Sequence, residues 1–391
     1  MLLGKIFRKV REHSSRPVVL EQCVVSYLSS LIPRLYSWVM LVLDRSISRV
    51  CIPFYDVYFA LRKKSSYSVD VHMCSTKYTN STAMLEGIEQ LTLAKTLSAY
   101  LGDDVQVSFS YWDDGQPILG YSFGFYRRMM TQDPKYLILV SYSTGVFYQP
   151  APWILSKLKK RNTCLIALWV DTCTHGFIPS ISPIIDIIDL HVFGDNPTMD
   201  FGDSNYVQRF KEKSLLVYLP CMPYEVEVKE RKKDIDVVFL GQIDSYRNVR
   251  KPYLEFLFEN SVNLYCFVGD KDDRCSYEKL YEVMSRAKIG VNFSMSGGVH
   301  QVKGRVMETM MTGGLLLEQR NNQTACYFSE GNDYVAFSSK EELVEKIKYY
   351  LAHEEERAKI AAAGEKKSRQ LYNGNGKLFW GAVFDSLDVK F

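Results

Sequence analysis

One short segment of the chain, residues 303–319 (KGRVMETMMTGGLLLEQ), carries two cations and a carboxylate close together. If its first part forms a helix, Arg305 and Glu308 stand three residues apart on one face. Lys303 then lies at the helix N-terminus, where unpaired amide groups and the helix dipole attract phosphate. A glutamate further along such a helix can accept hydrogen bonds from the hydroxyl groups of a ribose. By spacing alone, an ordinary surface ion pair explains Arg305 and Glu308 at least as well, so both interpretations stay open.

Glycine pairs flank this segment on both sides. Gly297 and Gly298 precede it in SMSGGVHQ, and a backbone without side chains can approach a diphosphate closely. Gly313 and Gly314 follow the expected helix and allow a tight turn into the apolar run LLLEQ. The order of glycine loop, polar helix and buried strand suits a nucleotide-binding edge of a sheet.

Strands and helices alternate along most of the chain, and these elements must position the polar residues. Runs such as KYLILVSY and CLIALWVD are continuously apolar, as in parallel sheets that are buried on both faces. Helical patterns separate them, so we predict an α/β protein with two Rossmann-like domains and a ligand cleft beyond the carboxyl ends of the strands. The predicted parts are a basic helical extension (1–65), a first Rossmann-like domain (66–224), a charged linker (225–234), a second Rossmann-like domain (235–375) and a C-terminal helix returning to the first domain (376–391).

Two polar residues that follow the run CLIALWV could act as a general base. Asp171 and His175 would lie at the carboxyl edge of the first sheet, and a carboxylate or an imidazole is the usual general base. Equally, Asp171 could cap a turn and His175 could be a surface residue. Asp113 and Asp114 in YWDDGQ are weaker candidates, because Asp-Gly sequences are typical of simple turns.

The first 64 residues are basic, with eleven Lys or Arg against four Asp or Glu, although the whole chain carries only +3. Aromatic residues lie among these cations, a combination that suits docking on anionic lipid. The most apolar stretch, Leu35–Leu43, is far shorter than the roughly 20 residues of a membrane-spanning helix. We therefore predict a cytoplasmic protein whose extension either packs on the body or docks peripherally on an anionic membrane surface.

Cysteine and histidine usage argues against several other classes of protein. The nine cysteines are scattered without a C-x-x-C pair, which disfavours a disulfide framework or a zinc site. The six histidines form no H-E-x-x-H motif, and DKDD at 270–273 is expected to be a solvated turn, so no metal is predicted. Neither half opens with G-x-G-x-x-G, which disfavours a dinucleotide oxidoreductase. The modest basic excess, confined to one end, disfavours nucleic acid as a partner.

Three quoted stretches of the second half resemble a known family. DVVFLGQIDSYR resembles its first strand with the following glycine and basic residue, and YEKLYEVMSRAKIGVNFS resembles a later helix and strand. The block from KGRVMETMMTGG to KIAAAG resembles its long terminal segment. Residues from Ile235 to about Gln370 are thus similar to the nucleotide-binding half of the group 1 glycosyltransferases, especially the spore-maturation branch.

This resemblance implies a GT-B fold and transfer of a sugar from a nucleoside-diphosphate donor without a tightly bound cofactor or metal. By the same resemblance, Glu308 would hold the ribose. The remaining implied donor-site residues are the cations Arg247, Lys303 and Arg305 on the diphosphate, and Gly241, Gly297 and Gly298 in the loops. The implied acceptor is a glycan or a lipid-linked glycan in surface polysaccharide or glycoconjugate synthesis, and the implied outcome is retention of configuration.

One position departs from the family pattern. Many relatives carry two glutamates eight residues apart, and the position eight before Glu308 is His300. His300 could still donate a hydrogen bond to a sugar hydroxyl. The departure keeps an alternative open, namely a non-catalytic GT-B scaffold or sugar-binding module at a membrane.

Overall fold

The computed structural model describes residues 39–40, 42–50, 69–74, 78–80, 85–86, 88–111, 121–142, 150–170, 183–196, 212–218, 232–241, 243, 248–268, 277–296 and 299–389. The chain divides into two compact units. One unit contains residues 1–64 and 115–131, and the other contains residues 65–114 and 132–391.

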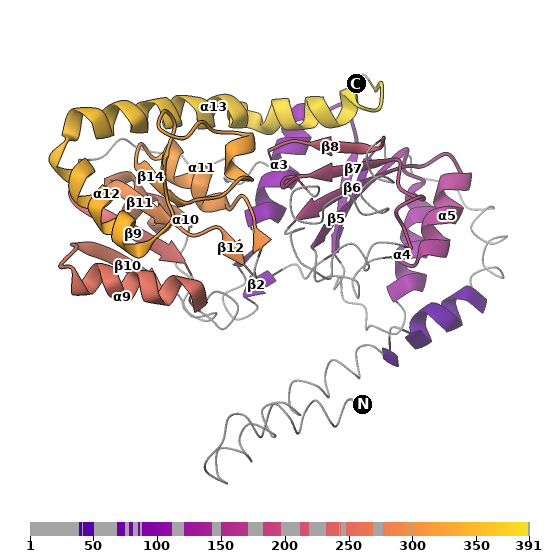
Figure 1. Ribbon diagram of the computed structural model, residues 1–391. Coiled ribbons are helices and arrows are strands. Elements are labelled where there is room, and N and C mark those ends of the chain that lie inside the picture. The colour runs from indigo at the N-terminus through magenta and orange to yellow at the C-terminus, as the bar shows by residue number, and fades with distance from the viewer. Residues whose placement is uncertain are drawn as a thin grey trace, which may run out of the picture. The chain divides into compact units, whose positions relative to one another are not determined.

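A six-stranded parallel sheet lies in the amino-terminal half of the larger unit, with strand order β4-β1-β5-β6-β7-β8 (Figure 1). Its central strands β5 and β6 are the apolar runs noted above, and nearly all of their described side chains are buried. The strands are β1 (Val69–Met73), β4 (Val107–Tyr111), β5 (Tyr136–Tyr142), β6 (Cys164–Val170), β7 (Leu190–Phe193) and β8 (Ser214–Leu216).

A five-stranded parallel sheet lies in the carboxyl-terminal half, with strand order β10-β9-β11-β14-β15. Its strands are β9 (Ile235–Gly241), β10 (Leu264–Val268), β11 (Ala287–Asn292), β14 (Leu315–Gln319) and β15 (Val335–Phe337). Two separate parallel sheets confirm the predicted architecture of two Rossmann-like halves.

Helices and short elements connect the strands. The helices among the described residues of the larger unit are α3 (Ile88–Leu101), α5 (Pro152–Lys160), α9 (Lys251–Glu259), α10 (Tyr277–Arg286), α11 (Gly304–Met311), α12 (Lys340–Ala352) and α13 (Glu354–Asp385). The short elements are the antiparallel pairs β2 (Tyr78–Asn80) with β3 (Leu85–Glu86) and β12 (Met295–Ser296) with β13 (Val299–His300), and the 3-10 turns η2 (Asn248–Arg250) and η3 (Thr324–Cys326).

The long helix α13 runs from the second sheet to the first (Figure 1). At its far end Trp380 Nε1 donates a 3.0 Å hydrogen bond to Thr96 Oγ1 of α3, and Phe379 and Trp380 belong to the core of the first sheet. Gly376 has a φ of 64°, and a Cβ there would lie 2.9 Å from Thr96 Cβ. Glycine therefore permits both the change of backbone direction and the close approach to α3.

The smaller unit contains a described helix at 39–40 and 42–50 and α4 (Tyr121–Gln132), which ends one residue into the larger unit. Among the described residues, no helix combines the length and the apolar character needed to cross a bilayer.

Candidate functional site

Helix α11 forms the first part of the segment 303–319 and carries Arg305 and Glu308. The helix begins at Gly304, directly after Lys303, which is its N-cap with an extended backbone at φ −88° and ψ 150°. Its buried residues are Val306, Met307, Glu308, Thr309, Met310 and Met311, so the helix is embedded among the second sheet, α10 and α13 rather than lying on the surface. Polar groups on this helix are therefore held in fixed positions.

In the Arg305–Glu308 pair the carboxylate of Glu308 is buried, and the guanidinium group of Arg305 is also held by a backbone carbonyl. Glu308 is only 5% exposed, Arg305 Nη1 donates a hydrogen bond to its Oε2, and the Tyr281 hydroxyl lies 3.5 Å from its Oε1. Arg305 Nε donates to the carbonyl oxygen of Leu240 at the end of β9, at 3.0 Å. The two residues therefore form the ion pair that their spacing predicts, with its carboxylate buried rather than on the surface.

Burial and charge act in opposite directions on Glu308. Removal from water raises the pKa of its carboxyl group, while the charge and hydrogen bond of Arg305 and the hydrogen bond of Tyr281 lower it. A carboxylate that keeps a cationic partner in a buried position can accept further hydrogen bonds with little competition from water. This arrangement can bind the hydroxyl groups of a ligand.

The buried residue Gln301 connects the segment before α11 to neighbouring residues of the second half by hydrogen bonds. Lys303 Nζ donates a hydrogen bond to Gln301 Oε1, and Gln301 is 2% exposed. Asn321 Nδ2 donates to the Gln301 carbonyl at 2.8 Å. His300 is half-buried in β13, where it pairs with Met295. The structure thus places His300, Lys303, Arg305 and Glu308 on one anchored stretch of chain.

Five predicted site residues lie outside the described residues, and their roles remain predictions: Asp171, His175, Arg247, Gly297 and Gly298. The same holds for Asp113 and Asp114 and for the DKDD turn. Gly241, which ends β9, is described and follows the Leu240 carbonyl that holds Arg305.

Arg250 is a buried cation near Gly241 that the sequence analysis missed. It is 7% exposed, and its Nη2 donates a 3.2 Å hydrogen bond to the carbonyl of Phe293, just beyond β11. A Cβ at Gly241 would lie 3.2 Å from Arg250 Nη1, so the absent side chain leaves room for the guanidinium group. The run RNVRK contained the signal, because Arg250 stands three residues after Arg247.

Glu318, a second buried carboxyl group, was also missed. It is 0% exposed on β14 and is paired in register with Asn292 of β11. It accepts hydrogen bonds from Asn292 Nδ2 at 2.7 Å, from the Ser294 hydroxyl and from Thr324 Oγ1 at 3.5 Å. Burial raises its pKa to about 7. A charged residue inside the apolar run LLLEQ was the sequence signal for a buried carboxyl group.

These groups share one edge of the second sheet. The strands β9, β11 and β14 are adjacent and parallel, so their carboxyl ends meet at the same edge. The Leu240 carbonyl, the Phe293 carbonyl and Glu318 lie at those ends, and α11 brings Arg305 to the first of them. Ligands of open α/β sheets bind at this edge.

A set of hydrogen bonds joins this edge to the loop after β7 of the first sheet. Asp195 Oδ1 accepts from the Val302 amide at 2.6 Å, directly before α11. Asn196 and Gln323 exchange two hydrogen bonds of 2.7 and 3.0 Å, and the Tyr327 hydroxyl donates to the Gly194 carbonyl at 2.7 Å. Sequence reasoning could not find these contacts, because the partners are more than a hundred residues apart.

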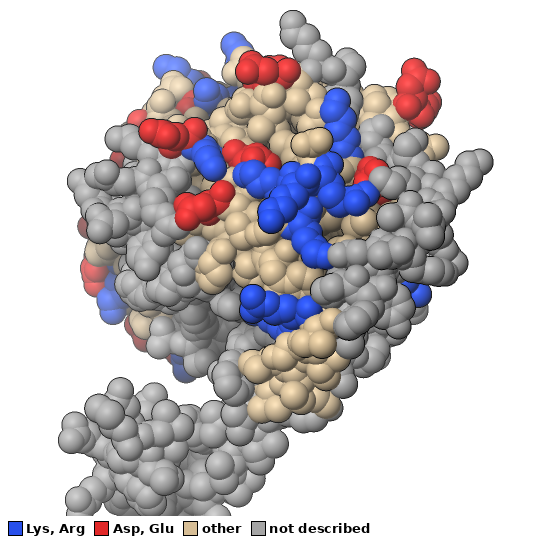
Figure 2. Space-filling view, turned by 90° about the vertical axis from the view of Figure 1, so that its right-hand side faces the viewer, with Lys and Arg blue, Asp and Glu red and all other residues tan. Residues whose placement is uncertain are grey.

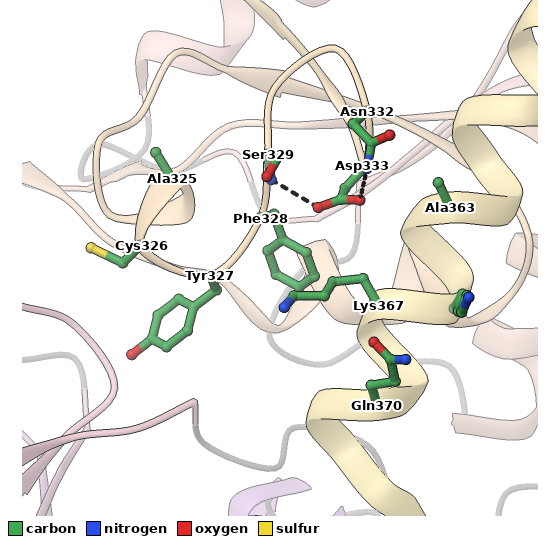
Figure 3. Close-up of a pocket in the computed structure, with 11 residues that line it drawn as sticks. Ala325, Cys326, Tyr327, Phe328, Ser329, Asn332, Asp333, Ala363, Lys367 and Gln370 are labelled. Carbon is green, nitrogen blue, oxygen red and sulfur yellow. Dashed lines mark hydrogen bonds between the residues drawn. The ribbon is translucent and has the colours of Figure 1, made fainter.

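A polar hollow of about 490 Å³ lies between the η3 region and α13 (Figure 3). Tyr327, Phe328 and Lys367 line it, and Asp333 accepts hydrogen bonds from the Ser329 amide and Asn332 Nδ2 at its rim. None of the residues predicted to hold a nucleotide lines this hollow. Within the described part of the chain, no group of three or more His, Cys, Asp or Glu side chains could hold a metal ion.

Comparison with known proteins gives a family match in the second half only. Residues 227–375 match a family described as glycosyl transferase-like. No curated protein matches the chain.

Solved structures share the fold of about four fifths of the chain at low sequence identity. HepE of Anabaena, in complex with UDP and glucose, is 7% identical with a TM-score of 0.54, covering 81% of this chain and all of its own. Sucrose-phosphate synthase of Thermosynechococcus elongatus is 11% identical with a TM-score of 0.56, covering 82% and 99%. A glycosyltransferase of Rickettsia africae is 10% identical with a TM-score of 0.52, covering 83% and 100%. The chain therefore has the GT-B fold, and its residues 227–375 match a family described as glycosyl transferase-like.

Proposed function

We propose that the protein is a glycosyltransferase that moves a sugar from a nucleoside-diphosphate donor to a glycan or lipid-linked acceptor. The observation that carries this proposal is the buried Glu308, held by Arg305 at the carboxyl edge of the second sheet within the glycosyl transferase-like segment. The resemblance to the spore-maturation branch and a role in surface polysaccharide or glycoconjugate synthesis belong to the same proposal.

Glu308 would bind the ribose of the donor, and cations would bind its diphosphate. Arg305 is held by the Leu240 carbonyl and by Glu308, which fixes its guanidinium group at the sheet edge. Lys303 stands at the N-terminus of α11, where the helix dipole adds to its charge. Arg247, and Arg250 which the structure adds to the candidates, would supply further positive charge around the diphosphate. Fixed cations stabilise the charge that develops as the nucleoside diphosphate leaves.

The donor nucleotide that we test first is UDP. Two similar structures of HepE hold UDP and UDP-glucose, and this supports a uridine nucleotide without identifying the sugar. We propose a reaction that needs no metal, because Lys303, Arg305 and Arg250 can neutralise a diphosphate.

The acceptor side of the proposal concerns three residues. Asp171 and His175 follow β6 in the sequence and are proposed to take the proton from the acceptor hydroxyl. His300 is proposed to donate a hydrogen bond to the transferred sugar, in place of the carboxylate that relatives carry. We propose retention of configuration and a peripheral location on the cytoplasmic face of an anionic membrane.

Nucleotide binding gives the first test. Thermal unfolding is measured with UDP, GDP, ADP, CDP and TDP, and a ligand at 100 times its dissociation constant should stabilise the protein by about 2.7 kcal/mol. A rise in the unfolding temperature with UDP supports the proposal, and no rise with any of the five contradicts it. A donor screen, with the anomer of the product assigned by NMR, then tests the reaction and its stereochemistry.

Because His300 stands where many relatives carry a glutamate, we also consider a second function, that of a non-catalytic sugar-binding scaffold at a membrane. Such a scaffold would bind a nucleotide sugar without turning it over. Transfer of sugar from any donor in the screen excludes it, and donor binding without transfer favours it.

A further inference from the structure

The helix at residues 39–50 turns its polar side inward and its aliphatic side outward. Asp44 and Ser48 are only 2% and 3% exposed. Five aliphatic side chains of the same helix are exposed, namely Val39 at 41%, Val42 at 43%, Leu43 at 44%, Ile47 at 50% and Val50 at 67%. A helix on the surface of a water-soluble protein normally has the opposite orientation.

The five exposed residues form a continuous stripe, which we call the aliphatic stripe. Their spacing of three or four residues, from Val39 through Leu43 and Ile47 to Val50, places them on one side of an α-helix. The exposed Ser46 also lies on this side, and its hydroxyl donates to the Val42 carbonyl at 2.7 Å. That bond satisfies the hydroxyl within the helix itself.

A polar anchor sets the rotation of the helix. Asp44 Oδ2 accepts a 3.1 Å hydrogen bond from the amide of Ser122, at the N-terminus of α4. This amide has no partner within its own helix, and the carboxylate also interacts favourably with the helix dipole. Ser48 Oγ donates to the Arg45 carbonyl at 3.2 Å, and burial lowers the pKa of Arg45. The contact with α4 therefore directs the polar side inward, and the aliphatic stripe faces outward as a consequence.

We propose that this helix lies flat on an anionic phospholipid bilayer, with the aliphatic stripe at the boundary between headgroups and acyl chains. Figure 2 shows the uncharged surface of the helix in tan, with basic side chains in blue at its border. Arg49 is exposed beside the stripe, so a cation stands where lipid headgroups would lie. The described part of the helix, residues 39–40 and 42–50, extends about 18 Å, and its polar side is held on α4, which favours binding along the surface.

Charge complementarity selects an anionic membrane over other occupants of the stripe. The first 64 residues contain eleven Lys or Arg and only four Asp or Glu, and a second copy of the same basic segment would repel it. An anionic bilayer offers an apolar layer for the stripe and negative charge for the cations at the same depth. The docking surface does not depend on the transferase reaction, and it defines the face that makes the proposed membrane contact.

Flotation of the full-length protein with liposomes tests this proposal. The probes are vesicles of phosphatidylcholine alone and of phosphatidylcholine mixed with phosphatidylglycerol. The test variant is Leu43→Glu with Ile47→Glu, and the matched control is Phe258→Glu with Leu378→Glu. The control side chains are 55% and 52% exposed on α9 and α13, so both variants place two carboxylates at exposed apolar positions.

We expect the wild type and the control to float with the anionic vesicles. The stripe variant should bind these vesicles at least about tenfold more weakly, because two aliphatic side chains no longer enter the bilayer and two anions face its charge. Both variants should keep the wild-type circular dichroism spectrum and unfolding temperature.

Three results would overturn the proposal: a wild type that stays with the soluble fraction, a stripe variant that floats as well as the control, or equal binding to both kinds of vesicle. A wild-type dimer that becomes monomeric in the stripe variant, with no flotation of either, would assign the stripe to a second copy of the chain. Loss of flotation together with a normal thermal shift on adding UDP separates this question from the proposed transferase function.

Discussion

Two buried glutamates lie close to the same edge of the second sheet, but their surroundings differ. Glu308 on α11 faces a cation, Arg305, and the Tyr281 hydroxyl. Glu318 on β14 accepts hydrogen bonds only from neutral groups, among them Asn292 and Ser294. Burial raises the pKa of both, and only for Glu308 does a neighbouring positive charge oppose the effect.

The difference indicates that the two glutamate side chains have different roles. A carboxylate paired with a cation stays ready to accept hydrogen bonds from a ligand. A carboxyl group surrounded by neutral donors holds together the strand ends and loops that carry those donors. We therefore expect Glu308 to serve ligand binding and Glu318 to hold the edge together, and substitutions at each position can separate the two roles.

The largest expected effect is on activity at Glu308. Glu308→Gln keeps the shape of the side chain but removes its charge, so the proposed hydrogen bonds to the ribose and the contact with Arg305 should both weaken. With the donor found in the screen, we expect kcat/KM to fall by a factor on the order of 100. Glu318→Gln is the matched control and should change kcat/KM less than about fivefold. Equal losses in both variants would contradict the division of roles.

The second effect is on stability at Glu318. Glu318→Leu leaves the amide of Asn292 and the hydroxyl of Ser294 without their carboxyl acceptor in a buried position. Each donor that loses its partner costs about 1 to 3 kcal/mol, so urea unfolding should show a loss of about 3 kcal/mol. A variant as stable as the wild type would show that the edge does not need this carboxyl group.

The third effect is the pH dependence of stability, which compares the wild type with Glu318→Gln. The folded-state pKa of Glu318 is raised from 4.5 to about 7, so the folded protein holds this proton more tightly than the unfolded chain. Its contribution to stability is fully present below pH 4.5 and is lost as the pH rises through about 7. From pH 5 to pH 7 the wild type should lose about 2 kcal/mol more than Glu318→Gln. Parallel curves for the two proteins would contradict the assignment.

The smallest effect concerns the hydrogen bond between Asp195 and the Val302 amide, directly before α11. Asp195→Ala removes the acceptor, and the loop that leads to Lys303 should become less well positioned. We expect the KM for the donor to rise about three- to tenfold, as for the loss of one hydrogen bond of about 1 kcal/mol. Asp189→Ala removes the ion-pair partner of Lys159 on α5, far along the chain from α11; it is the control and should leave the KM unchanged.

Much of the fold could be predicted from the sequence, because its signals are local. Continuous apolar runs such as those of β5 and β6 are typical of parallel strands, and the helical patterns between them predicted the α/β alternation. The helix expected in the segment that begins at Lys303 is α11 (Gly304–Met311), which carries Arg305 and Glu308 three residues apart. The structure and its similarity to solved glycosyltransferase folds confirm this architecture.

The site could be predicted only in part. Arg305 and Glu308 could be named as candidates because their spacing puts them on one face of a short helix, and Lys303 because it stands at the N-terminus of that helix. Arg250 and Glu318 were missed, since each is defined by partners on other strands and turns, the Phe293 carbonyl for one and Asn292 for the other. A sequence pattern shows which residues share an element, and it does not show which elements meet.

By itself, the sequence determined the order of strands and helices, the apolar cores of both sheets and the chemical character of α11, because each depends on residues close together in the chain. Only the tertiary structure decided that Glu308 is buried, that Glu318 joins two strand ends and that the aliphatic stripe of residues 39–50 faces outward. Burial and orientation depend on what packs against an element. For the helix at 39–50, the anchor that decides them is an amide of Ser122, 78 residues further along the chain from Asp44.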